Sequence, residues 1–512
     1  MKKYTLLSLS VAVLTACTIF EPVPAEAPYA PYSLVAGDTV KTREDKNLLK
    51  TKNLEADAIK IIVVGEQVVT YKEPKLHTPP AKDPDLSKIK NNEDPDLKGK
   101  PLRMVAIGGS LTAGVRDGGY FNEGIMTSYP NLIARQMKLK KFEQPLFNAT
   151  DYNGYGRKVR TDFNPTGGPV PKYLQAANNS GIASIDEKSN MKLKKYSGDL
   201  DNFAIPRQRG SNYAPSVGGN SENRNNYDNS GYELIKRISY VKDESITDML
   251  FKKKFDIMLI ETGYEEIWGY LFGARTLGAW PYLTDEKWFS DKEQVNTERL
   301  SSYIGYFTNS TPISPPFMYC LEAKKRNTKN VVLVNTPNFL DFPYFKTIKS
   351  KDVDAIYSMA SKNQLREISS YLPTSTIDSL ISPKVHISLK PWLKSEDSDP
   401  NGDSFISNVK LVSYKRILKE FNDEKEAIAK KFNHPLVDLK SLFDKILRNE
   451  FTTDDGVKVD STWPIGNFFS NDGVNPTAFG QAVIANEVIK TMNSFYKTEI
   501  PMIPTREYLL VK

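Results

Sequence analysis

Ser110 is the residue of this chain whose surroundings best suit a nucleophile. It follows the apolar run Met104–Ile107 and two glycines, and small residues come after it. This pattern predicts a buried strand, a tight turn and the start of a helix. Such a turn lifts a serine hydroxyl out of the sheet and aims backbone N–H groups at the space above it, which suits nucleophilic catalysis. A second interpretation, that Ser110 only caps the helix, fits the same pattern.

Three further blocks stand where strands end or helices begin. They are Asn202-Phe203-Ala204-Ile205-Pro206-Arg207, Gly263-Tyr264-Glu265-Glu266 and Phe469-Ser470-Asn471-Asp472-Gly473-Val474-Asn475-Pro476-Thr477. Together with Gly108-Gly109-Ser110-Leu111, their order resembles that of the SGNH (GDSL) hydrolases, especially lipoprotein members from Bacteroidetes-type bacteria. The resemblance covers roughly residues 101–503. It implies a flavodoxin-like three-layer α/β sandwich with a parallel sheet, long loop insertions and an esterase-type site.

The resemblance carries over to only two catalytic residues. The family's nucleophile matches Ser110, and its acid matches Asp472. Four other positions are substituted: Gly109 replaces the aspartate beside the serine, Arg207 and Glu265 replace the oxyanion glycine and asparagine, and Asn475 replaces the base histidine.

These substitutions remove chemistry that acyl transfer needs. An asparagine amide cannot accept the serine proton, and an ionised Glu265 would repel a developing oxyanion. As structure, the same residues make sense: Asn475 before Pro476 predicts a helix N-cap followed by proline. We also expect Arg207 and Glu265 to form an ion pair that fills the former oxyanion hole.

A replacement base is hard to find in the sequence. The chain contains three histidines. His77 lies in a predicted linker, His434 stands at a predicted strand start, and His386 lies in a predicted insertion. His386 is therefore only a remote candidate, beside Glu265 and Glu266, whose pKa burial could raise.

Strand and helix patterns alternate through the main domain, which predicts a parallel sheet covered on both faces. The expected strands are 102–107, 255–261, 330–334 and 434–439, and the expected helices are 128–137, 411–432 and 477–495. Sites in such sheets form at the carboxyl ends of strands, where Ser110, Gly263 and Asn335 fall. Three insertions (140–230, 270–325 and 345–410) and a tail (504–512) complete the predicted domain.

The N-terminus predicts export and lipidation. A charged start and a short apolar run end in Leu14-Thr15-Ala16-Cys17, a secretory signal over 1–16 that resembles a lipoprotein signal with lipid on Cys17. Residues 17–100 then predict a tether with a small β hairpin at 58–71 and a linker. That linker contains two Asp-Pro-Asp-Leu repeats, at 83–86 and 94–97. Cys320 is the other cysteine, so the mature chain can form no intramolecular disulfide.

Composition argues against several classes of function. Lys and Arg exceed Asp and Glu by only 69 to 62, without an arginine-rich tract or zinc-ligand spacing, so we expect no nucleic-acid partner, metal or cofactor. The expected function is a pseudoenzyme, anchored to a bacterial outer membrane, that binds an envelope protein; a glycan or an acyl ester is a further candidate partner. The alternative is an active serine esterase, acylhydrolase or glycan deacetylase that uses Ser110 with a non-standard base. The membrane face is left open.

Overall fold

The computed structural model describes residues 59–64, 67–72, 80, 82–90, 93–160, 173–175, 178–185, 191–207, 229–239, 246–271, 315–347, 386–388, 405–406, 408–463 and 466–509. The signal, Cys17 and most of the tether lie outside these residues. So do 272–314 of the second predicted insertion and most of the third.

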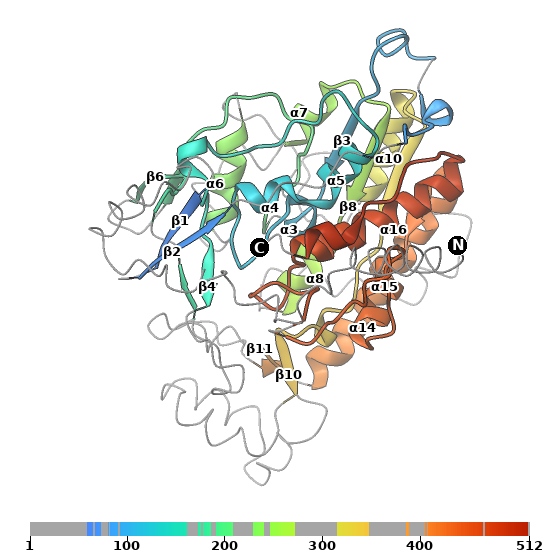
Figure 1. Cartoon of the computed structure of the whole chain (residues 1–512). Helices are drawn as coiled ribbons and strands as arrows, with labels where there is room; N and C mark the ends of the chain where they lie inside the picture. Colours follow the sequence, from blue (N-terminus) through green and yellow to red (C-terminus); the bar gives the residue numbers. More distant parts are fainter. Residues whose placement is uncertain are drawn as a thin grey trace, which may run out of the picture.

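A parallel sheet forms the centre of the domain (Figure 1). Its strands are β3 (Met104–Ile107), β8 (Ile257–Glu261), β9 (Asn330–Val334) and β13 (Leu436–Val437), in the order β13-β9-β8-β3. Every residue of β3, β8 and β9 is buried, as expected for parallel strands covered on both sides. The predicted α/β fold with a parallel sheet is therefore confirmed, and all four predicted strands are present.

A fifth segment extends the sheet beyond β3. Asn202 pairs with Ala106 in parallel, and the N–H groups of Phe203 and Ile205 donate to the carbonyls of Ala106 and Gly108. Numbered along the chain, the strand order is therefore 2-1-3-4-5. The order reverses between β3 and β8, and ligand sites of such sheets lie at this reversal, beyond the carboxyl ends of the strands.

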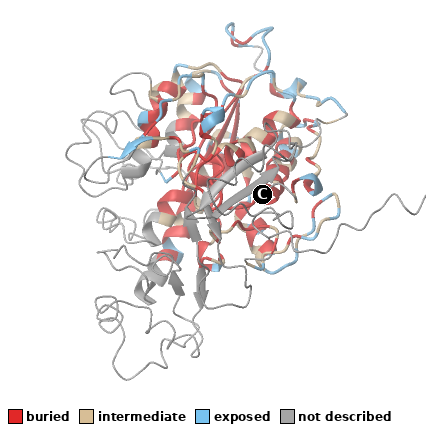
Figure 2. Cartoon of the chain, turned by 60° about the vertical axis from the view of Figure 1, so that its left-hand side comes forward, coloured by how far each residue is buried: buried red, intermediate tan, exposed pale blue. Residues whose placement is uncertain are grey.

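Helices cover both faces of the sheet (Figures 1 and 2). Met104 and Ala106 of β3 pack into one core cluster, with α5 (Tyr129–Gln136), α15 (Leu439–Leu447) and α16 (Ala478–Tyr496). Val105 and Ile107 pack into the other, with α6 (Asn229–Ile238), α7 (Ile246–Phe251) and α10 (Pro315–Lys325). The long helix α14 (Asn408–Phe432) contributes to both clusters. Alternate side chains of a strand point to opposite faces, which is why one strand serves two cores.

Shorter elements complete the described part. They are β1 (Ile59–Val64), β2 (Gln67–Lys72), η2 (Ser87–Ile89), α3 (Ser110–Ala113), α4 (Asn122–Met126), η3 (Ala149–Asp151), β4 (Lys158–Arg160), β5 (Tyr173–Gln175), β6 (Ile182–Ile185), β7 (Met191–Leu193), α8 (Tyr264–Leu271), η10 (Phe339–Asp341), β10 (Phe345–Thr347), β11 (His386–Ser388), β12 (Phe405–Ile406) and η12 (Thr505–Tyr508). The antiparallel pair of β1 and β2 forms the hairpin that the sequence predicts at 58–71.

Several segments predicted as loops or termini belong to the packed domain. The first insertion contains the buried segment beside β3, in which Phe203 is fully buried. The second contains α10, whose Tyr319 and Cys320 are fully buried. In the predicted tail, Tyr508 of η12 is 1% exposed and packs in the core with α16. These segments were predicted as loops because their overall composition is polar, although each contains a few apolar residues that pack into the core.

The described part of the predicted linker, residues 82–90 and 93–100, lies along the amino ends of the strands. Ile89 is fully buried, and its carbonyl accepts a 2.6 Å hydrogen bond from Asn330 at the start of β9. Asp94 of the second Asp-Pro-Asp-Leu repeat pairs with Lys254 at 3.2 Å. The second repeat therefore docks at the amino ends of the strands, away from Ser110, and the first pairs with Lys138 and Glu499, so neither acts as a free spacer.

Candidate functional site

Ser110 lies at the reversal of strand order. It is the first residue of α3, directly after β3, and only 6% of it is exposed. Gly109 occupies the N-cap position of α3, and no side chain caps the helix. The interpretation of Ser110 as the helix cap is therefore wrong. A Cβ on Gly108 would lie 2.8 Å from the carbonyl oxygen of Glu261, which shows how closely β3 and β8 approach at this turn.

The substituted residue Arg207 keeps the backbone donor that the resemblance implies. Its N–H donates to Ser110 Oγ at 3.1 Å. Its φ is +60°, in the left-handed region that favours glycine, and the residue is exposed. The arginine side chain therefore does not fill the space beside the serine.

Glu265 is the group that occupies this space. It is 6% exposed, and its Oε1 accepts a 2.7 Å hydrogen bond from the N–H of Ser110. The Ser110 side chain also lies near enough to this carboxyl group to favour its ionised form. The predicted Arg207–Glu265 ion pair is wrong, because the hydrogen bond of Glu265 goes to Ser110 and the Arg207 residue is exposed.

Gly109 makes room for Glu265. A Cβ at position 109 would overlap Cγ of Glu265 and lie 3.0 Å from its Oε1. A side chain at position 109 would therefore require the Glu265 side chain to move. The absence of a side chain at Gly109 leaves the space that the glutamate fills.

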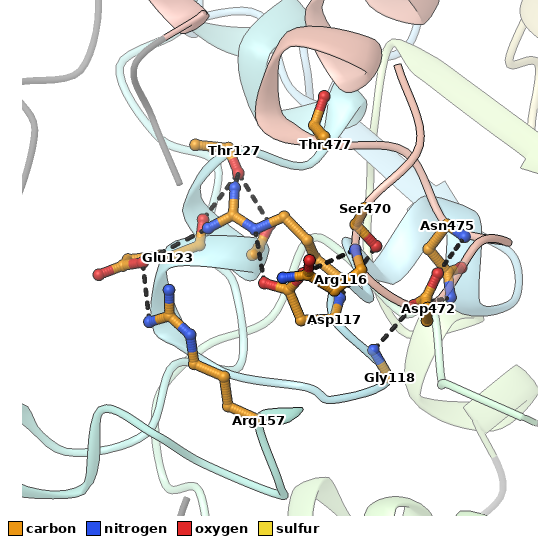
Figure 3. Close-up of polar contacts among 12 residues, drawn as sticks. Arg116, Asp117, Gly118, Glu123, Thr127, Arg157, Ser470, Asp472, Asn475 and Thr477 are labelled. Carbon is orange, nitrogen blue, oxygen red and sulfur yellow. Dashed lines mark hydrogen bonds and ion pairs between the residues drawn. The ribbon is translucent and has the colours of Figure 1, made fainter. Parts of the chain in front are cut away.

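Asp472 and Asn475 form the second half of the site (Figure 3). The Asn475 amide Nδ2 donates to Asp472 Oδ2 at 2.9 Å, and the Asn475 N–H donates to Oδ1 at 2.7 Å. The amide therefore holds the bond to the acid that a base histidine would hold. Its Oδ1 is buried without a hydrogen-bond partner, and among the described contacts no hydrogen bond joins Asn475 to Ser110. The predicted N-cap at Asn475 is wrong, because Thr477 caps α16 by accepting from Gly480 N at 3.0 Å.

A tight turn at Arg116–Gly119 holds Asp472 in place (Figure 3). Asp117 and Gly118 both have positive φ (+52° and +64°), and Arg116 and Gly119 exchange backbone hydrogen bonds. Asp-Gly is typical of such two-residue turns. Gly118 N donates to Asp472 Oδ2 at 2.8 Å, and Asp117 N donates to Ser470 Oγ at 3.0 Å.

A cluster of buried charged side chains packs against this turn. Arg157 and Arg116 approach Glu123 Oε2 at 3.1 and 3.4 Å, and both guanidinium groups lie over the ring of Phe121. Burial raises the pKa of the Asp117 carboxyl, and the two arginines oppose that rise. Buried ion clusters of this kind fix geometry more than they add stability.

A second charged cluster lies under the serine turn. Glu261 Oε2 accepts from Gly109 N at 3.0 Å, and Glu266 Oε2 accepts from Gly263 N at 2.7 Å. The cation that faces these carboxylates is Lys425 of α14, which is 1% exposed and donates to Thr336 Oγ1 at 2.9 Å. Burial lowers the pKa of Lys425 to about 8 and raises the pKa of Glu261.

Of the three histidines, the structure describes the side chain of His434 and the strand position of His386. His434 is stacked on Phe432, and burial lowers its pKa to about 4, which agrees with a structural role. His386 lies in β11, where it pairs with Thr347 and Ile406. His77 lies outside the described residues.

The sequence analysis predicted that Ser110, Arg207 and Glu265 lie close together, and it singled out Asp472 and Asn475. It missed the residues that support them, the Asp117-Gly118 turn and Lys425. The Asp117-Gly118 dipeptide is a turn signal that could have been found. The sequence did not indicate that Lys425 is buried, because a lysine in a helix rich in Lys and Glu is expected to be exposed.

Comparisons with protein-family models, curated proteins and solved structures find no significant match to this chain. In the described part of the chain, no helix is long and apolar enough to cross a membrane. The same residues contain no cluster of three or more His, Cys, Asp or Glu side chains that could hold a metal ion.

The pKa of Glu265 predicts a pH dependence of stability. Burial raises this pKa from 4.5 to about 7, so between these values the folded state binds more protons than the unfolded state. The contribution of Glu265 to stability is therefore fully present below pH 4.5 and is lost as pH rises through 7. Between pH 5 and pH 8, the free energy of unfolding measured in urea should fall by up to about 3 kcal/mol more for the wild type than for Glu265→Gln. An equal pH response of the two proteins would contradict this expectation.

Proposed function

We propose that this protein is a pseudoenzyme of the SGNH-hydrolase type, a lipid-anchored scaffold that serves as a binding or assembly subunit of an envelope complex at a bacterial outer membrane. The observation that carries the proposal is the Asp472–Asn475 pair. An amide is bonded to the acid where a hydrolase needs an imidazole, and an amide cannot take a proton from serine at working pH.

The arrangement of the sheet supports the SGNH-like part of the proposal. The 2-1-3-4-5 strand order is the flavodoxin-like one, and helices lie on both faces of the sheet. Ser110 and Glu265 follow the two strands on either side of the order reversal. A sheet with this order and a serine at this point is what the family resemblance implies.

The scaffold part of the proposal rests on the lost chemistry and on the N-terminal signal. Lipid on Cys17 would tether the domain to the membrane, and the long insertions would contact an envelope protein, or alternatively a glycan or an acyl ester. Long loops on a rigid α/β scaffold commonly carry such binding functions.

A second candidate function is an esterase in which Glu265 acts as the base. The specific observation in its favour is that the Glu265 carboxyl group lies beside Ser110, bonded to its N–H at 2.7 Å, and has a pKa raised to about 7 by burial. A base with a pKa near the working pH is suited to proton transfer. Against it, the same carboxyl group holds the Ser110 N–H, which an esterase would need for the oxyanion.

Labelling by a fluorophosphonate probe tests both candidates, because the probe reports an activated serine without the right substrate. We expect the full chain purified in detergent to give only the background labelling that Ser110→Ala gives. Labelling that is lost in Ser110→Ala would refute the pseudoenzyme proposal. Labelling that is also lost in Glu265→Gln, with Glu266→Gln as the matched control, would support the esterase.

A further inference from the structure

Glu265 is more than a missing oxyanion donor. Its carboxyl group accepts a 2.7 Å hydrogen bond from the backbone N–H of Ser110 and lies beside the serine side chain. The remaining donor near the serine, the N–H of Arg207, is bonded to Ser110 Oγ. Both N–H groups that could receive an external acyl group or carboxylate at Ser110, those of Ser110 and Arg207, are therefore engaged by the protein itself.

The chain is built to hold Glu265 in this position. Position 109 lacks a side chain where a Cβ would overlap Glu265. Glu265 stands in the first turn of α8, between Tyr264 and Glu266. The Tyr264 hydroxyl donates to the Val474 carbonyl at 3.4 Å, and Glu266 accepts from Gly263 N at 2.7 Å. Both neighbours fix the start of α8 over the serine turn.

The titratable groups that act on Glu265 are Glu261 at the end of β8 and Glu266 on α8. Lys425 of α14 acts on those two carboxylates, and Asp472, in the turn before α16, acts with Glu265 on Tyr264. Glu261 and Glu266 disfavour the ionised form of Glu265, whereas its interactions with Ser110 favour that form. The interactions with Ser110 are the attractive contacts that keep this carboxyl group in place.

We infer that Glu265 is an internal blocking group: its carboxyl group occupies the position of an external carboxylate or oxyanion at Ser110, and so closes the serine to ligands. This inference rests on the proposed loss of hydrolysis but adds a second, independent block. Loss of the base at Asn475 stops proton transfer, and Glu265 stops access. Restoring the base alone therefore does not restore a reactive serine.

The first test measures occupancy. Glu265→Ala removes a CH₂–COO⁻ group, which has the size of acetate. In thermal unfolding at pH 8, acetate should raise the Tm of Glu265→Ala by about 3 °C relative to chloride at equal ionic strength. The wild type and Glu265→Gln should not respond, because their own side chains fill the position. A Glu265→Ala protein that ignores acetate, or a wild type that responds equally, overturns the inference.

The second test measures access. Fluorophosphonate labelling is compared in Asn475→His, in Asn475→His with Glu265→Asn, and in Asn475→His with Glu265→Gln. The Asn variant shortens the side chain by one methylene, whereas Gln keeps its length. We expect Glu265→Asn to raise the labelling rate at least about 100-fold over Asn475→His alone, with Glu265→Gln close to the single variant. Equal labelling with and without Glu265→Asn, whether fast or absent, overturns the inference.

The two proposals fail in different ways. Labelling of the wild type that depends on Ser110 refutes the pseudoenzyme, and with it the claim that Glu265 closes the serine. Equal acetate responses, in a wild type that is not labelled, refute the internal block alone and agree with the loss of the base. Circular dichroism of each variant confirms that the fold is retained.

Discussion

Replacing Lys425 by methionine is expected to lower the free energy of unfolding by about 3–5 kcal/mol. Lys425 is 1% exposed, and its charge opposes the rise in the pKa of Glu261 that burial causes. Methionine fills a similar volume but leaves Glu261 and Glu266 without the cation that faces them. Removing one member of a buried charge cluster costs far more than the cluster contributes, because the remaining charges stay buried and uncompensated.

Urea unfolding at pH 7 measures this loss, because Lys425, whose pKa is lowered to about 8, is mostly charged there. Lys419→Met is its matched control: Lys419 lies on the same helix, its side chain is 75% exposed, and it pairs with Asp423 four residues on. Such a surface pair is worth less than about 1 kcal/mol. The loss in Lys425→Met should shrink at pH 5, where Glu261, whose pKa burial raises, takes up a proton more readily. Equal losses in the two variants would show that Lys425 does not compensate the cluster.

Gly119→Ala should destabilise the domain by several kcal/mol, on the order of 3 or more. A Cβ at this position would overlap the carbonyl oxygen of Gly156 and lie 2.9 Å from Cα of Arg157. Both obstacles are backbone atoms, which cannot rotate away as a side chain can. The turn that holds Asp472 would have to separate from the 154–157 segment, and with it Arg157 would leave Glu123.

Gly456→Ala is the control for this prediction. Gly456 has a φ of +80°, and a Cβ there would meet nothing within 4 Å, so only backbone strain of about 1 kcal/mol applies. Thermal unfolding compares the two variants, and near-equal Tm values would contradict the steric argument. A chain with Gly119→Ala that does not fold at all agrees with the prediction.

Arg207 shows how a substitution can mislead when only its side chain is considered. The sequence suggested a bulky obstacle at an oxyanion position, yet the exposed side chain leaves the N–H aimed at Ser110 Oγ. Backbone donors survive a change of side chain if the residue can adopt the required φ, here +60°. Arginine pays a modest strain for this conformation.

Local sequence patterns were enough to predict the α/β class, the four strands and the residues worth testing. Apolar runs gave the four strands, and periodic apolar positions gave α5, α14 and α16, because these signals are local and repeat along the chain. The glycine turn before Ser110 and the substituted positions 109, 207, 265 and 475 were also legible in the sequence.

The contacts among those residues follow from the packing of distant segments. Glu265 and Ser110 are 155 residues apart, so neither the bond between them nor the room that Gly109 leaves for the carboxyl group follows from a local pattern. The same holds for Lys425, whose burial depends on which face of α14 meets the ends of β8 and β9. Contacts between distant segments depend on how whole elements pack, and packing is set by the complete core rather than by any one stretch of sequence.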